Sequence, residues 1–166
     1  MFTDLLRATT LIAAALLGVA GVGKLIAPHG AMRALRAQGL PAGRAVAAAI
    51  GTAEVLIGSA VVLTLSPLAL AALALVYVGF AGFVWRAARR GTPCGCLGER
   101  DATARLGHAA LNAVVAVAAT VLIFADRITT SDLLTDQPAA GVPFVALIVT
   151  GVALAHAWLA AEATPS

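Results

Sequence analysis

Long apolar runs set the strongest limit on what this chain can fold into. Four of them lie at about residues 9–27, 44–65, 68–85 and 106–125, and a shorter one lies at about 142–159. A helix of about 20 apolar residues crosses the roughly 30 Å hydrocarbon core of a bilayer. Only helices satisfy their own backbone hydrogen bonds in lipid when the runs are this long. The sequence therefore predicts an all-α, polytopic membrane helix bundle with four core transmembrane helices and a fifth.

The composition also indicates a membrane protein rather than a soluble domain. Hydrophobic residues make up 61% of the chain and charged residues 11%, whereas soluble domains average about 45–50% apolar and about 25% charged residues. The net charge of +3 is accounted for by basic residues at the ends of the apolar runs, as membrane orientation requires. We therefore expect a multi-pass protein of the cell (plasma) membrane that contacts lipid and no nucleic acid.

The predicted helices divide the chain into two parts. Residues 1–126 hold four helices and a cysteine-containing loop at 86–105, and residues 127–166 hold a polar loop and the fifth helix. We interpret the first run as a retained helix, because no A-x-A cleavage site follows it. The basic stretch after Pro28 predicts a short interfacial helix. The short link at Ser66-Pro67 predicts a tight antiparallel hairpin.

Two charged residues lie within the predicted spans, Lys24 and Glu54. An ionisable side chain in hydrocarbon costs about 2.5–3.5 kcal/mol on insertion scales, so such residues usually face the interior of the bundle. Small residues on the same helix faces, such as Gly21, Gly51 and Gly58, agree with that orientation. One interpretation is an ion pair between them, although their depths, counted from the helix ends at about 1.5 Å per residue, differ by about 10 Å. Alternatively, Lys24 extends to the interface and a protonated Glu54 bonds to another helix.

Two further polar residues share one face of the fourth predicted helix. Asn112 lies one turn from His108, and an asparagine in a span commonly joins helices through a hydrogen bond. We interpret His108 as an interfacial residue. The alternative is that it acts as a base for a nearby thiol.

The loop RRGTPCGCLGER, residues 89–100, contains both cysteines of the chain, Cys94 and Cys96. A zinc site requires four ligands, and the sequence places only His108 near this single C-x-C pair. We therefore expect no metal, with Cu(I) bound by two thiolates as an alternative. A structural disulfide across one residue would restrict little chain entropy. Chance occurrence also stays open, because C-x-C is a short pattern.

A redox dithiol explains the residues around the cysteines best. Arg89 and Arg90 place positive charge near the pair, which favours thiolate over thiol. Pro93 restricts the approach to the first cysteine, and Gly95 allows the backbone angles needed to bring the sulfurs together. A disulfide across one residue closes a strained ring, and strain makes a disulfide easier to reduce.

The segments GVGKL, GTAEVLIG, CGCLG and HAALNAVV occur in this order. Together they resemble the MauE family of methylamine-utilisation membrane proteins, within a broader MauE/DoxX group of redox-associated membrane proteins. The resemblance covers about residues 10–125, and the CGCLG loop is its specific part. It implies a role in maturation of the disulfide-rich small subunit of methylamine dehydrogenase, beside a thioredoxin-like partner. It also implies that Cys94 and Cys96 are the redox dithiol and that Lys24, Glu54 and Asn112 form an intramembrane polar set.

The loop is also similar, more weakly, to the dithiol of quinone-coupled thiol oxidoreductases such as vitamin K epoxide reductase. Those enzymes carry a second cysteine pair, which this chain lacks. No cofactor is therefore required for thiol exchange, and a quinone stays open as an alternative.

Charge bias and the implied role disagree about the side of the membrane that the cysteine loop faces. The loops after the first and third predicted spans hold eight arginines against two on the other side: Arg33, Arg36, Arg44, Arg86, Arg89, Arg90, Arg100 and Arg105 against Arg7 and Arg127. The positive-inside rule places the loop in the cytoplasm. The implied role in maturation of an exported protein instead favours a cysteine loop that faces the outside of the cell membrane. We adopt the charge rule.

The sequence thus predicts a multi-pass membrane protein that passes electrons through Cys94 and Cys96 to or from a thioredoxin-like partner. Whether it is an enzyme, a thiol–disulfide oxidoreductase, is left open, and a homo-oligomer is one alternative for its assembly. Two other functions remain: a non-catalytic membrane assembly factor, and a small transporter or metal handler that uses Glu54 and Lys24.

Overall fold

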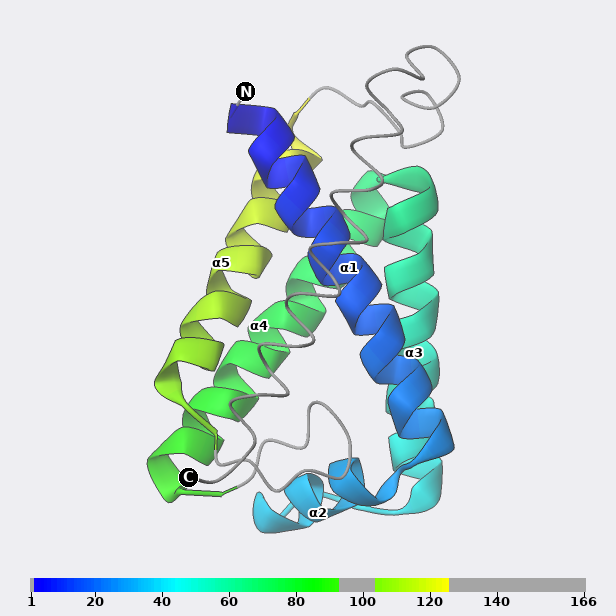
Figure 1. Cartoon of the computed structure of the whole chain (residues 1–166), viewed down its shortest axis with the longest axis vertical. Coiled ribbons are helices and arrows are strands. Elements are labelled where there is room, and N and C mark those ends of the chain that lie inside the picture. Colours follow the sequence, from blue (N-terminus) through cyan, green and yellow to red (C-terminus); the bar gives the residue numbers. More distant parts are fainter. Residues whose placement is uncertain (1, 93–103, 126–166) are drawn as a thin grey trace.

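The computed structural model describes residues 2–92 and 104–125, all of whose regular structure is helical (Figure 1). The helices are α1 (Phe2–Ile26), α2 (His29–Ala37), α3 (Arg44–Thr64), α4 (Pro67–Arg90) and α5 (Leu106–Ile123). By length and composition, α1, α3, α4 and α5 can each cross a membrane. These four spans confirm the predicted all-α membrane bundle. The predicted fifth helix at 142–159 lies outside the described residues.

The helix ends follow local sequence signals. Leu65 ends α3 in the left-handed region at φ 46°, and the Ser66 hydroxyl then accepts the N–H of Ala69 at 3.3 Å, with Pro67 in the first turn of α4. Proline suits a first turn because that turn leaves its N–H groups unbonded. At its other end α4 stops at Gly91, whose φ of 61° favours glycine.

Helix α4 extends further than the hydropathy of its sequence predicts. The apolar run ends near Trp85, but the helix continues to Arg90, so the first residues of the predicted loop at 86–105 belong to the helix. Arginines in the last turn interact favourably with the helix dipole, and the Arg89 guanidinium lies 4.7 Å from the centre of the Trp85 ring. The segment between helices is therefore shorter than predicted, from Gly91 to Arg105.

Helix α2 lies across one end of the bundle (Figure 1). It buries the small residues Gly30, Ala31 and Ala34 and exposes Arg33 and Arg36. The prediction of a short helix after Pro28 is confirmed, and its amphipathic pattern is typical of a helix that lies in the membrane interface.

The packing of the long helices differs from the predicted hairpin. Helix α1 packs most extensively against α3, and α4 against α5, whereas α3 and α4 make few contacts although two residues join them. Figure 1 shows α4 running diagonally away from α3 from their shared end. Residue size agrees with this arrangement. Helix α3 turns glycines towards α1, which allows those two helices to approach closely, whereas α4 contributes the larger side chains of Leu73 and Tyr77 to the core. The Tyr77 hydroxyl donates to the carbonyl of Ala13 on α1 at 2.8 Å.

Three glycines bring the backbones of α1 and α3 into contact. A Cβ atom on Gly58 would lie 2.5 Å from the carbonyl oxygen of Ala14, and one on Gly21 would lie 2.6 Å from that of Gly51. Because both obstacles are backbone atoms, no side-chain rotation can relieve these contacts. Small residues at such positions are what allow membrane helices to approach closely.

We expect Gly58→Ala to destabilise the protein by about 1–3 kcal/mol, as overpacking of a close interface does. Gly79→Ala on α4 is the matched control, because its Cβ would meet nothing within 4 Å. Alanine is a better helix former than glycine by about 1 kcal/mol, so this control should leave stability unchanged or raise it. Thermal unfolding in detergent measures both variants. Equal losses would contradict the close contact of α1 with α3.

Candidate functional site

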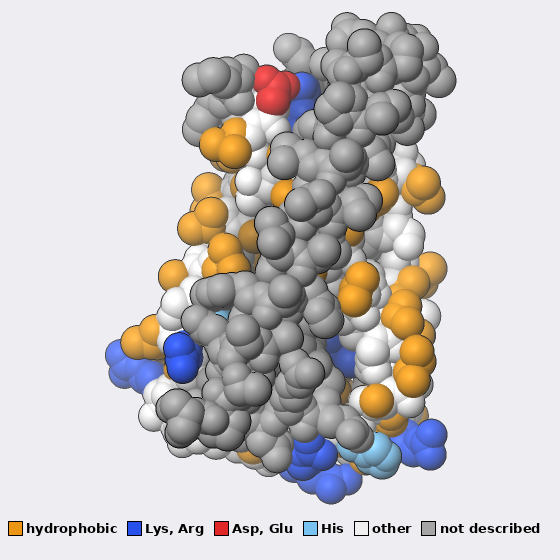
Figure 2. Space-filling view, in the orientation of Figure 1, with side chains coloured by type: hydrophobic (Ala, Val, Ile, Leu, Met, Phe, Trp, Pro, Cys, Tyr) orange, Lys and Arg blue, Asp and Glu red, His pale blue; other side chains and the backbone are white. Residues whose placement is uncertain are grey.

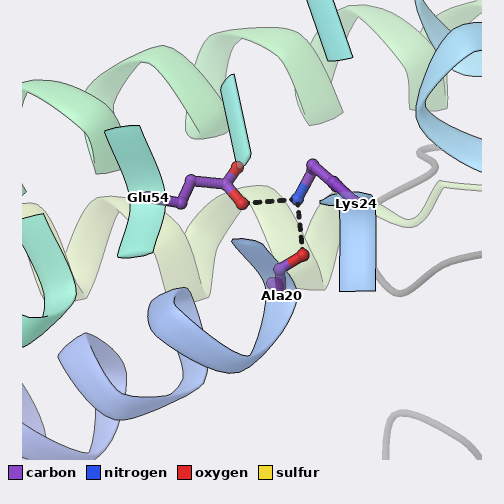
Figure 3. A network of polar contacts seen from close by, with 3 residues as sticks. All are labelled: Ala20, Lys24 and Glu54. Carbon is purple, nitrogen blue, oxygen red and sulfur yellow. Dashed lines mark hydrogen bonds and ion pairs between the residues drawn. The ribbon is translucent and has the colours of Figure 1, made fainter. Parts of the chain in front are cut away.

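The α1–α3 interface holds a buried ion pair near the C-terminal end of α1 (Figure 3). The Lys24 Nζ donates to Glu54 Oε2 at 2.7 Å and lies 3.5 Å from the carbonyl oxygen of Ala20. Lys24 is 7% exposed and Glu54 is 2% exposed. Of the two arrangements that the sequence left open, the structure has the ion pair.

The pair forms because the two helix ends are not level. Gly51 lies against Gly21 and the Cβ of Lys24, so the first turn of α3 projects beyond the end of α1. This register places Glu54 beside Ala20, about one turn or ~6 Å from Lys24. Side chains on a helix lean towards its N-terminus, and in these antiparallel helices the two side chains therefore lean towards each other. The predicted 10 Å difference in depth assumed level ends.

One oxygen of this carboxylate is not used. Glu54 Oε1 is buried and has no hydrogen-bond partner among the residues that the structure describes. A buried ion pair offsets its desolvation only where geometry and further hydrogen bonds are good. The pair can therefore accept one more donor at Oε1, within the membrane-spanning part of the protein.

A second polar cluster lies where the cysteine loop begins and ends. The N–H of Ala104 donates to the carbonyl of Thr92 at 3.2 Å, so the chain leaves α4 and returns to α5 at one point. The Gln38 Nε2, at the end of α2, donates to the Thr92 hydroxyl at 3.0 Å. We call Gln38, Thr92 and Ala104 the loop base.

The loop base was not predicted from sequence. Gln38 lies in a basic, polar stretch where nothing in the sequence indicates burial, yet it is only 2% exposed. Its burial depends on tertiary contacts, because Gln38 follows α2 and bonds to Arg86 of α4 and to Thr92. The position of Thr92, two residues before Cys94, was the one signal that could have drawn attention to it.

The remaining predicted site residues lie at the same end of the bundle or outside the described part. Pro93, Cys94, Gly95 and Cys96 are outside the described residues. Arg89 and Arg90 are exposed on the last turn of α4. His108 is half-buried in the first turn of α5, where its backbone N–H donates to the Arg105 carbonyl at 3.1 Å.

Asn112 lies one turn further along α5 and is half-buried. The expected hydrogen bond between helices is not among those formed within the described part of the chain, and Asn112 does not bond to Lys24 or Glu54 there. Within residues 2–92 and 104–125, no three His, Cys, Asp or Glu side chains are grouped closely enough to hold a metal ion.

The end of the bundle that carries the loop base is strongly basic. Figure 2 shows Lys and Arg side chains gathered at its lower end, with an acidic side chain at the opposite end. In the described residues, the links and helix termini at the lower end contribute seven arginines and no acidic residue: Arg33, Arg36, Arg44, Arg86, Arg89, Arg90 and Arg105. The links after α1 and α4 therefore lie on one side of the membrane, as the sequence predicts.

These features define a multi-pass helical membrane protein with a buried ion pair and a basic end from which the cysteine loop leaves. The family described as Methylamine utilisation protein MauE matches residues 3–125. The chain belongs to the MauE family, and the resemblance is confirmed. Comparisons with curated proteins and with solved structures found no match.

Proposed function

We propose that this chain is a thiol–disulfide redox protein of the plasma membrane that acts in methylamine dehydrogenase maturation. It exchanges electrons through Cys94 and Cys96 with a thioredoxin-like partner. The observation that supports this proposal most concerns the residues that flank the cysteines: in sequence both cysteines lie between Thr92 and Ala104, which are joined by a hydrogen bond at the basic end of the bundle.

The exchange proceeds by two thiolate attacks. One cysteine thiolate attacks a disulfide of the partner, which forms a mixed disulfide and releases one partner thiolate. The second cysteine then attacks the mixed disulfide, which closes the Cys94–Cys96 disulfide and releases the second partner thiolate. Two electrons pass to the partner, whose sulfurs take up two protons, and the reverse sequence oxidises it.

The basic surroundings of the loop support the reactive form of the cysteines. Arg89 and Arg90 end α4 within seven residues of both cysteines, and nearby positive charge favours the thiolate. His108 stands four residues after Ala104 and is the candidate base for the second thiol. The single-cysteine variants Cys94→Ser and Cys96→Ser test the proposal, because each leaves one attacking sulfur and no resolving one.

We expect the loop to face the cytoplasm, because the positive-inside rule applies to seven described arginines at its end of the bundle. A phosphatase that is active only outside the cytoplasm should therefore be inactive when fused after Arg105. The same reporter fused after Ala125, at the opposite end of α5, is the matched control and should be active. The reverse pattern would place the loop outside and would assign the arginines to the thiolates rather than to orientation.

A second candidate function uses the buried pair. The buried Oε1 of Glu54, which has no hydrogen-bond partner among the described residues and lies beside Lys24 within the helix bundle, is what favours a small transporter or metal handler. Intramembrane ionisable residues commonly mark substrate or ion pathways. That function requires Glu54 even when both thiols are intact, which separates it from thiol exchange.

A further inference from the structure

We propose that a groove between α4 and α5, at the basic end of the bundle, binds an anionic phospholipid, with an acyl chain in the groove and the phosphate on Arg89. Such a site uses residues of these two helices only and does not depend on thiol exchange. The groove has a volume of about 410 Å³, and its walls are apolar side chains and one glycine: Ala81, Gly82, Trp85, Leu106, Ala109 and Ala110.

The groove opens on the outer surface of the bundle. Gly82, Leu106 and Ala110 are exposed, and Trp85 is 49% exposed. Both helices are long and apolar enough to cross a membrane, so their exposed faces meet the hydrocarbon of the bilayer. None of the residues that line the groove is charged. A hydrocarbon chain therefore matches the chemistry of its walls.

Gly82 keeps the groove open. A Cβ atom on this residue would meet no other atom within 4 Å, so no close helix contact requires glycine here, in contrast to Gly21 and Gly58 between α1 and α3. The facing side of the groove is formed by Ala109 and Ala110 of α5. The small side chains on both helices leave room for a chain that comes from outside the bundle.

Arg89 lies at one wall of this groove. Its guanidinium carbon is 4.7 Å from the centre of the Trp85 ring, and Trp85 lines the groove. A guanidinium over an aromatic ring keeps its N–H groups available as donors. Arg89 is exposed and forms no ion pair or hydrogen bond with the residues that the structure describes. Its planar set of donors matches the oxygens of a phosphate group.

The charge around the groove favours an anionic headgroup over a zwitterionic one. Arg105 is exposed and directly precedes Leu106 in the groove wall, and the first turn of α5 contains no acidic residue. The positive end of the α5 dipole lies at the same place. Figure 2 shows the Lys and Arg side chains that gather at this end. Basic pockets between membrane helices on the cytoplasmic side bind anionic lipid headgroups.

Trp85 allows occupancy of the groove to be measured directly. The chain has one other tryptophan, Trp158, and the variant Trp158→Phe leaves Trp85 as the only fluorophore of this kind. The full-length variant is reconstituted in vesicles of phosphatidylcholine and phosphatidylglycerol, in which one of the two lipids carries dibrominated acyl chains that quench tryptophan on contact. Comparison of the two labelled mixtures, each normalised to unbrominated vesicles, gives the relative affinity of the two lipids at Trp85.

We expect phosphatidylglycerol to be preferred over phosphatidylcholine at Trp85 by about three- to tenfold. Gly82→Leu places a side chain in the groove at a position where its Cβ meets no other atom within 4 Å, and Arg89→Gln removes the charge at the groove wall. Each should lower the preference to about one, because the first excludes the acyl chain and the second releases the phosphate. Should Gly82→Leu fail to fold, Arg89→Gln carries the same test.

Two matched controls separate a built site from the general charge of this end of the bundle. Gly23→Leu on α1 enlarges another glycine whose Cβ would meet nothing within 4 Å, away from the groove. Arg36→Gln removes an exposed arginine from α2 at the same end. Both variants should keep the full preference for phosphatidylglycerol.

Equal affinity for the two lipids in the Trp158→Phe protein would overturn the proposed site. An equal loss in Arg36→Gln and Arg89→Gln would also overturn it, because the preference would then belong to the whole basic end. Protection of Trp85 from both brominated lipids would show that protein covers the groove, either a second copy or another part of the chain, and would overturn the lipid site as well.

Discussion

Cys94→Ser and Cys96→Ser are each expected to accumulate a covalent complex with a thioredoxin-like partner. In each variant the remaining thiolate can form the mixed disulfide, but no second cysteine is present to resolve it. The chain contains no other cysteine, so any complex that disappears on reduction must be joined through the remaining one. Acid-quenched membranes run on non-reducing gels, followed by mass spectrometry of the shifted band, measure the result.

Comparison of the two variants also shows which cysteine attacks the partner and which one resolves the mixed disulfide. The cysteine whose retention gives the stronger complex is the attacking residue, and the other is the resolving residue. A complex in only one of the two variants therefore supports the proposal, whereas no complex in either contradicts it.

The double variant Cys94→Ser/Cys96→Ser separates exchange from scaffolding. We expect complete loss of function with little change in thermal unfolding, because both residues lie in a polar stretch of sequence between α4 and α5 and serine is close to cysteine in size. The matured disulfide content of the methylamine dehydrogenase small subunit is the functional measure. Full function in the double variant would favour a non-catalytic assembly factor instead.

Hydropathy predicted the four spans well because each is decided by local composition. The ends of α3 and α5 agree with the predicted runs to within a residue or two. The extension of α4 to Arg90 was missed because hydropathy follows the bilayer edge, whereas the helix continues until Gly91 ends it.

The arrangement of the helices depended on features that no local pattern contains. The sequence identified the small residues beside Lys24 and Glu54, but it did not show that they join α1 to α3 in preference to α3 to α4. It also could not supply the register, which decides whether the Lys24 Nζ reaches Glu54. Gln38 was missed for the same reason, since its burial accompanies tertiary contacts such as the hydrogen bond from Arg86 of α4 to its carbonyl.

The largest effect on stability is expected at the buried ion pair. Glu54→Gln leaves the Lys24 ammonium, which is 7% exposed, without its charged partner, and Lys24→Met does the same to the carboxylate. Removal of one partner from a buried pair typically costs about 3–5 kcal/mol. Asp4→Asn is the matched control, because Asp4 pairs with Arg7 at 3.4 Å with its side chain 64% exposed. Arg7 is itself buried, but the Asp4 carboxylate is largely solvated, so its removal should cost less than removal of either partner of the fully buried pair.

The double variant Lys24→Met/Glu54→Leu decides whether the pair serves stability or chemistry. Removing both charges takes away the desolvation cost together with the attraction, so we expect stability near that of the wild type or higher by about 1–4 kcal/mol. If the pair only joins α1 to α3, the double variant keeps its function and the single variants lose it by unfolding. The double variant can also be stable and keep its thiol exchange, yet be inactive. In that case the Lys24–Glu54 pair, with the Glu54 Oε1 that has no partner among the described residues, has a chemical role beyond stability. Three measurements on the two single variants and the double variant distinguish these outcomes. They are thermal unfolding, the reduction of the Cys94–Cys96 disulfide by dithiothreitol, and the disulfide content of the methylamine dehydrogenase small subunit. Full function in a stable double variant would rule out the transporter, because that function depends on the charged groups of Lys24 and Glu54, which this variant lacks.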